Sequence, residues 1–129
     1  MKEPTWIPLN VVQVIHAQQV AEYGGLPGVR DQGLLLSALT RPKNLLAYDE
    51  NINLYDLAAP YAYGIIRNHP FIDGNKRTGL AVALTFLLFN DAPLIIEEVE
   101  AAVMIEMLAA GDLTESQLAE FFKGIAKKL

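Results

Sequence analysis

The sequence NHPFIDGNKRTGLAVALTFLLF, residues 68–89, places a dense polar cluster directly before the longest apolar run of the chain. That run, residues 79–89, is far shorter than the roughly 20 residues that a membrane-spanning helix needs. It predicts a buried helix over residues 75–90, because a helix that is apolar on nearly every side belongs in the middle of a bundle. The other elements are expected to pack around this central helix.

Helical spacing dominates the rest of the chain and predicts a compact all-α bundle of about six helices. Besides the central helix, they are expected over residues 10–23, 31–41, 54–68 and 96–110 and from residue 114 onward. Four of them start at residues that commonly cap helix N-termini, namely Asn10, Asp31, Asn53 and Thr114. The helix over residues 96–110 carries an apolar stripe made of Val99, Val103 and Met107.

Two prolines set expectations for helix ends and bends. Pro42 is expected to stop the second helix, because proline lacks the N–H that continues the helical ladder. The polar residues 42–53 are then expected to form a short loop or hairpin. Pro60 is expected to kink the third helix unless that helix begins just before it.

Composition narrows the class of protein. A chain of 129 residues with 52% hydrophobic side chains suits one folded domain over residues 1–129. The absence of cysteine excludes disulfides and suits a reducing cytoplasm. No signal peptide or membrane anchor is evident, so a cytoplasmic protein without membrane attachment is expected. The net charge of −5 argues against direct nucleic-acid binding, because phosphate contacts dominate that affinity.

The polar cluster has the features of an anion site. Pro70 disfavours the helical conformation at His69, so the third helix should end at about residue 68. Gly74 permits backbone angles that other residues avoid, and the next helix begins directly after it. The first N–H groups of that helix lack helical partners, and the helix dipole adds positive charge there. Lys76 and Arg77 add two full charges, so the junction is expected to bind an anion, most commonly phosphate.

The remaining polar residues suit phosphate chemistry. Asp73 could hold Mg²⁺, which takes one or two carboxylates together with phosphate oxygens. His69 could act as a general base on an attacking hydroxyl, and the Asn75 amide could orient a phosphate oxygen. Phe71 is expected to anchor the loop in the core.

Each residue also has an ordinary interpretation: a helix-end histidine, a carboxylate cap, or solvated cations. Two cations at a helix N-terminus are nevertheless unfavourable without an anion to offset them. Other sites fit less well, since GNKRTG lacks P-loop spacing and two histidines without cysteine make zinc unlikely. His16 is interpreted as structural or exposed.

The motif HPFIDGNKRT, residues 69–78, resembles the HPFx[DE]GNxR signature of the Fic/Doc family. Three longer stretches are similar to its Doc (death-on-curing) toxin branch: GGLPGVRDQGLLLSALTRP at residues 24–42, YAYGIIRNHPFIDGNKRTGLAVALTFL at residues 61–87 and AAGDLT at residues 109–114. The resemblance implies a helical Fic fold with its active site at the junction. It implies that His69 deprotonates a target hydroxyl, that Asp73 binds Mg²⁺, and that the phosphate cradle consists of Gly74, Asn75, Lys76 and Arg77. It also implies that residues 42–53 form a flap that aligns the target segment.

Two departures from the family pattern bear on which phosphate is transferred. AMP-transferring members usually carry GNGRxxR, whereas Lys76 here replaces the second glycine and Leu80 the final arginine. Lysine prevents the close backbone approach that glycine allows, and leucine cannot clamp a phosphate. This matches the Doc branch, whose members transfer the γ-phosphate of ATP to a threonine of elongation factor Tu and stop translation.

The resemblance thus implies a serine/threonine protein kinase that uses ATP and Mg²⁺. The alternatives are a Fic-type AMP transferase and a catalytically idle nucleotide- or partner-binding module, which has no need of His69 and Asp73. The family's inhibitory motif [ST]xxxE[GN] is not matched, because Phe121 follows the correctly spaced Ser116 and Glu120. A separate antitoxin resembling Phd is therefore implied as a partner.

Overall fold

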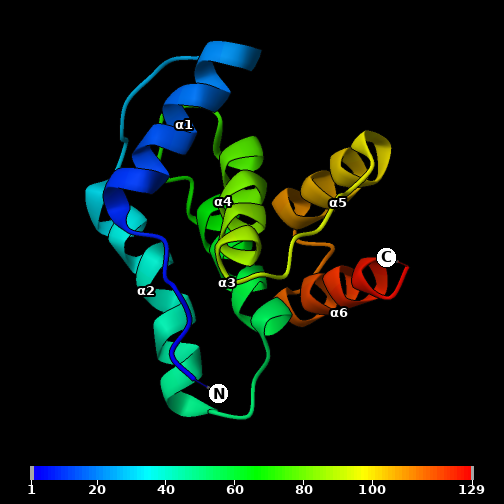
Figure 1. Ribbon diagram of the computed structural model, residues 1–129. Coiled ribbons are helices and arrows are strands. Elements are labelled where there is room, and N and C mark those ends of the chain that lie inside the picture. The colour runs from blue at the N-terminus through cyan, green and yellow to red at the C-terminus, as the bar shows by residue number, and fades with distance from the viewer. Residues whose placement is uncertain (1, 129) are drawn as a thin grey trace.

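The computed structural model describes residues 2–128, which form six helices and no strand longer than an isolated antiparallel bridge between Val29 and Phe71 (Figure 1). The helices are α1 (Leu9–Tyr23), α2 (Gln32–Tyr48), α3 (Leu54–Asn68), α4 (Asn75–Phe89), α5 (Glu98–Ala110) and α6 (Glu115–Ala126). The predicted all-α bundle of about six helices is confirmed. None of these helices is both long enough and apolar enough to cross a membrane.

Three of the four predicted N-caps are present. The Asp31 carboxylate accepts a hydrogen bond from the Leu34 N–H, and capping boxes open α3 at Asn53 and α6 at Thr114. The prediction for Asn10 is wrong, because α1 begins at Leu9. The N-cap there is Pro8, whose carbonyl accepts the first two helical hydrogen bonds at 3.1 Å and leaves Asn10 inside the helix.

The predicted stop at Pro42 is also wrong. Helix α2 continues through this proline to Tyr48, so the loop or hairpin expected over residues 42–53 is reduced to residues 49–53. A proline inside a helix costs about 3 kcal/mol. Pro42 is itself buried, and Leu45 and Leu46 beyond it pack against the core, which offsets that cost. Pro60 likewise lies buried inside α3, which begins at Leu54 and not at the proline.

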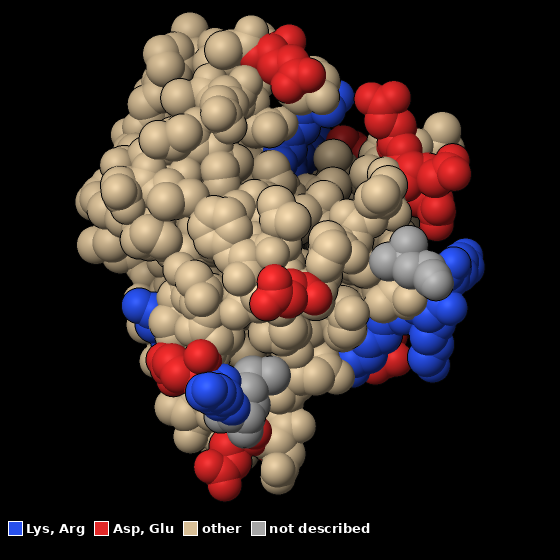
Figure 2. Space-filling view, viewed as in Figure 1, with Lys and Arg blue, Asp and Glu red and all other residues tan. Residues whose placement is uncertain are grey.

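Helix α5 is the least buried of the six. Its predicted stripe exists but faces solvent, with Val99 76%, Val103 55% and Met107 38% exposed. The residues that α5 does bury are Met104 and Leu108. Acidic side chains gather at this edge of the molecule, to the upper right in Figure 2.

Helices α3 and α4 form the centre of the bundle. Helix α3 packs against α2, α4, α5 and α6, while α1 and α5 cover α4. The two central helices approach closely at Gly79, where an added Cβ would lie only 2.8 Å from Ile66 Cγ1 and 3.1 Å from the Ala62 carbonyl oxygen. A residue without a side chain is therefore required at this crossing.

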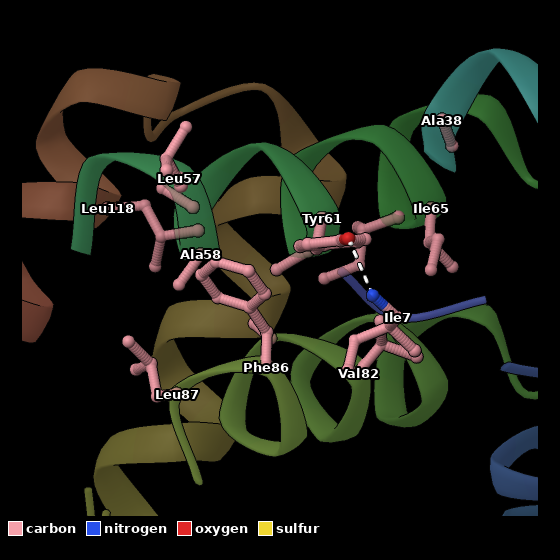
Figure 3. Packing of buried hydrophobic residues seen from close by; sticks show 14 of the residues in the cluster. Ile7, Ala38, Leu57, Ala58, Tyr61, Ile65, Val82, Phe86, Leu87 and Leu118 are labelled. Atoms are coloured by element: carbon pink, nitrogen blue, oxygen red, sulfur yellow. Dashed lines mark hydrogen bonds between the residues drawn. The ribbon is translucent and has the colours of Figure 1, made fainter. Parts of the chain in front are cut away.

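Aromatic packing ties the N-terminal segment to this centre (Figure 3). The Tyr61 and Phe86 rings lie 5.2 Å apart, and the Tyr61 hydroxyl accepts a hydrogen bond from the Ile7 N–H at 3.1 Å. Tyr61 is fully buried, and this burial raises its pKa to about 12.

Candidate active site

The loop between α3 and α4 is bounded by two left-handed residues. Helix α3 ends at Asn68, and His69 has φ 50° and ψ 53°. Gly74 has φ 78° and is the N-cap of α4, with no side-chain cap. The helix therefore stops before Pro70 as predicted, and Asp73 does not cap the helix that follows.

The side chain of Asn75 folds this loop. Its Oδ1 accepts a hydrogen bond from the Phe71 N–H at 2.9 Å, and its Nδ2 donates to the Phe71 carbonyl at 3.0 Å. Phe71 is fully buried and Asn75 is 6% exposed. The amide is thus engaged within the loop, and the contact of Asn75 with phosphate stays a prediction.

The imidazole of His69 is held by the same amide. Asn75 Nδ2 lies 3.3 Å from His69 Nδ1, and the two bonds to Phe71 fix which end of the amide faces the ring. This contact restrains the orientation of the His69 ring.

Helix α1 supports the loop through His16, which is buried. Its ring stacks on Phe71, and its Nε2 lies 2.8 Å from the Asp73 carbonyl oxygen. His16 is therefore structural in this fold, because it holds Phe71 and Asp73 of the loop in place.

Residues 24–31 support the loop from its other side, and sequence reasoning missed them. The Pro70 carbonyl accepts hydrogen bonds from Arg30 and Asp31, and the Ile72 N–H donates to Gly28 at 3.1 Å. Residues 28–31 thereby form a short antiparallel contact with residues 70–72. No local sequence pattern predicts such a contact, because both segments are predicted to be loops.

The expected flap does not border this loop. Residues 42–48 are helical, and the connection at residues 49–53 lies at the opposite end of the molecule from the α3–α4 loop (Figure 1). The connecting segment beside the site is residues 24–31, which contact it directly. The prediction failed because α2 continues past Pro42 and carries residues 42–53 away from the junction.

A cavity of about 440 Å³ opens above the N-terminus of α4. It is lined by the end of α1, the α3–α4 loop, the start of α4 and one side of α5, including Tyr23, His69, Asp73, Gly74, Asn75, Lys76, Arg77 and Glu106. Figure 2 shows basic side chains inside a hollow between acidic ones in this region. The residues predicted for catalysis, metal binding and phosphate binding are therefore brought together in one pocket.

The two pocket cations have partners on other helices. Lys76 Nζ lies 2.8 Å from Glu106 Oε1 on α5, and the Arg77 guanidinium lies 3.7 Å from the centre of the Tyr23 ring on α1. Leu80 lines an adjoining groove of about 380 Å³, not the pocket itself. These partners were not foreseen, because α1 and α5 are remote from the motif in sequence.

The donor set fits a magnesium ion that is shared with a bound phosphate. Within residues 2–128, no three His, Asp or Glu side chains converge to hold a metal by themselves. Asp73 Oδ2 accepts a hydrogen bond from the Leu26 N–H at 2.8 Å, and no described residue donates to Oδ1. A single carboxylate beside an anion pocket is the arrangement that suits Mg²⁺ with phosphate oxygens.

Comparison with known proteins gives consistent matches. The model of the Fic/DOC family matches residues 6–87, which include the whole α3–α4 loop. The chain is 34% identical over 106 residues to "Protein kinase doc" of Escherichia phage P1, covering 82% of this chain and 83% of that protein. It is 41% identical over 87 residues to "Toxin Doc" of Mycolicibacterium smegmatis, covering 67% of this chain and 66% of that protein.

Proposed function

The chain belongs to the Fic/Doc family, and from this premise we propose that it is a Doc-like toxin with protein kinase activity. In this proposal the γ-phosphate of ATP is transferred to a threonine hydroxyl of a protein target. The observation that carries it is the convergence of His69, Asp73, Lys76 and Arg77 on one pocket at the N-terminus of α4. The name of the phage P1 relative supports phosphoryl transfer in particular.

Each group in the pocket would have a distinct role in phosphoryl transfer. The free backbone N–H groups at the start of α4, with Lys76 and Arg77, bind the phosphates of ATP and offset their charge. His69 accepts the proton of the target hydroxyl while the hydroxyl oxygen bonds to the γ-phosphorus. The bond from the γ-phosphorus to the β–γ bridging oxygen breaks, and ADP leaves. Asp73 would hold Mg²⁺, which supplies charge neutralisation at the phosphates.

Lys76 and Leu80 favour γ- over α-phosphate transfer. The Lys76 side chain extends to α5, where it pairs with Glu106, and Leu80 presents a hydrocarbon surface to the neighbouring groove. Helix α4 therefore has no second arginine one turn after Arg77 that could bind the phosphates of a nucleotide placed further along the helix. A γ-phosphate bound at the helix N-terminus needs only the first-turn groups.

Family membership extends the proposal to partners. We propose elongation factor Tu as the target, with arrest of translation as the result, and a Phd-like antitoxin as the cognate inhibitor. The unmatched inhibitory motif supports a separate inhibitor, because Ser116 and Glu120 are ordinary residues of α6 and the partly buried Phe121 packs against the core.

Transfer with isotopically labelled ATP tests this function. The protein is incubated with elongation factor Tu and with ATP labelled at either the α- or the γ-phosphorus, beside a His69→Ala control. We expect the γ label alone on the target, and none with His69→Ala. Transfer of the α label would establish AMP transfer instead. ATP binding without transfer of either label, together with a His69→Ala variant as toxic as wild type, would establish an idle binding module.

A further inference from the structure

The Arg30 side chain forms hydrogen bonds with the end of the helix that carries His69. Its Nε donates to the His69 carbonyl at 2.7 Å, and its Nη2 donates to the Asn68 carbonyl at 2.9 Å. Carbonyls at a helix C-terminus lack helical partners and carry the negative end of the dipole. A planar guanidinium satisfies two of them at once, which a lysine ammonium cannot do with the same geometry.

The residue that Arg30 holds is in an unfavourable backbone conformation. Within residues 2–128, only His69 and Asp91 are non-glycine residues with positive φ. Such a conformation costs free energy and persists only when the surroundings impose it. Two hydrogen bonds from Arg30 contribute to these surroundings. Its side chain donates to the carbonyl of His69, and its backbone N–H donates to the Pro70 carbonyl at 2.7 Å.

We propose that Arg30 is a positioning residue that fixes the backbone of His69 and so aims its imidazole into the pocket. Arg30 is not among the residues that line the pocket, and therefore it acts through His69 without contact to the phosphates. The expected loss of catalytic rate without Arg30 rests on the proposed function, in which His69 is the base. The expected change in the conformation of His69 does not rest on it.

The kinetic test compares Arg30→Met and Arg30→Lys with Arg41→Met. Arg41 is a matched control, because it is also an exposed arginine whose guanidinium makes two contacts, an ion pair with Glu115 and a stack over Tyr63 at 5.2 Å. We expect kcat to fall about 100-fold in Arg30→Met, since small displacements of a reacting group have effects of that order. KM for ATP should stay within about twofold, because the groups that bind phosphate are unchanged. Arg30→Lys should be intermediate, and Arg41→Met should match wild type.

A second readout does not depend on turnover. The chain has two histidines, so ¹H–¹³C spectra of the imidazole rings contain two sets of signals, and His69→Ala assigns them. In Arg30→Met and Arg30→Lys we expect the His69 signal to shift or broaden while the His16 signal stays in place. If wild type transfers no phosphate, the proposed function fails, and the spectra still decide the role of Arg30.

Three outcomes would overturn the proposal. The first is an unchanged His69 signal in a folded Arg30 variant. The second is equal displacement of both histidine signals, which means that the whole loop has collapsed. The third is wild-type kcat and spectra in Arg30→Lys, which means that the two-pronged contact is not required. Arg30→Lys keeps the charge but has a single donor nitrogen, so it serves if Arg30→Met does not fold.

Discussion

The ring of His16 lies flat on the ring of Phe71, with centroids 3.8 Å apart and planes 8° from parallel. The same imidazole reaches the Asp73 carbonyl oxygen through Nε2 at 2.8 Å. Helix α1 therefore supports the α3–α4 loop both by aromatic packing and by a hydrogen bond. The position of the proposed metal ligand depends on a side chain 57 residues away.

Replacement of His16 should separate these two contributions. His16→Phe keeps an aromatic ring on Phe71 and loses the hydrogen bond, so we expect a loss of about 1 kcal/mol in the free energy of unfolding. His16→Ala loses both and opens a cavity, so a loss of about 3 kcal/mol is expected. Urea denaturation monitored by circular dichroism measures both. Equal losses in the two variants would show that the stacking contributes nothing.

The Tyr23 ring should hold Arg77 in place for ATP. Tyr23→Phe retains the aromatic face under the guanidinium, and Tyr23→Leu removes it. An exposed cation–π contact is worth about 0.5–1 kcal/mol, so we expect KM for ATP to rise about two- to fivefold in Tyr23→Leu. Tyr23→Phe should match wild type in the same steady-state assay. A rise in Tyr23→Phe as large as in Tyr23→Leu would assign the effect to the hydroxyl.

Glu106 should compete with ATP for Lys76. Its side chain is 65% exposed and lines the pocket, so Glu106→Gln frees Lys76 and removes a negative charge. We expect ATP to bind up to about fivefold more tightly at low salt, with a smaller gain as ionic strength rises. Glu100→Gln, on the same helix but outside the pocket, is the control. Calorimetric titration measures both, and weaker binding by Glu106→Gln would mean that Glu106 helps to hold the nucleotide.

Tyr61 should make the fold sensitive to alkaline pH. Burial raises its pKa from 10.0 to about 12, so the folded state disfavours the phenolate. This stabilisation is complete below pH 10 and is lost as the pH rises through about 12, because the unfolded chain ionises first. The loss is of order 3 kcal/mol at most. Tyr61→Phe should show a flatter decline in unfolding free energy between pH 10 and 12, and an equally steep decline would exclude Tyr61 as the cause.

Local rules predicted the features of the site that neighbouring residues determine. The end of α3 before Pro70, the left-handed Gly74 and the burial of Phe71 follow from the chemistry of one short segment. The N-caps at Asn53 and Thr114 follow in the same way.

Features that depend on tertiary packing were not predictable from the sequence. Helix α2 continues through Pro42 because the burial of its apolar side chains outweighs the lost hydrogen bond. Local sequence rules do not include the free energy of that burial. Arg30, Tyr23 and Glu106 reach the site from separate elements, and nothing in their own neighbourhoods marks them.

The crossing at Gly79 restricts how the pocket can adapt. Gly79 of α4 adds no side chain where it packs against Ala62 and Ile66 of α3, and α3 carries His69 at its end while α4 begins the proposed phosphate cradle. We therefore expect the proposed base and the proposed cradle to move together. Tyr23 and Glu106 stand on α1 and α5, outside this pair of helices. We therefore expect any widening of the pocket that admits a nucleotide to come from those two walls, while the spacing between His69 and the start of α4 stays constant.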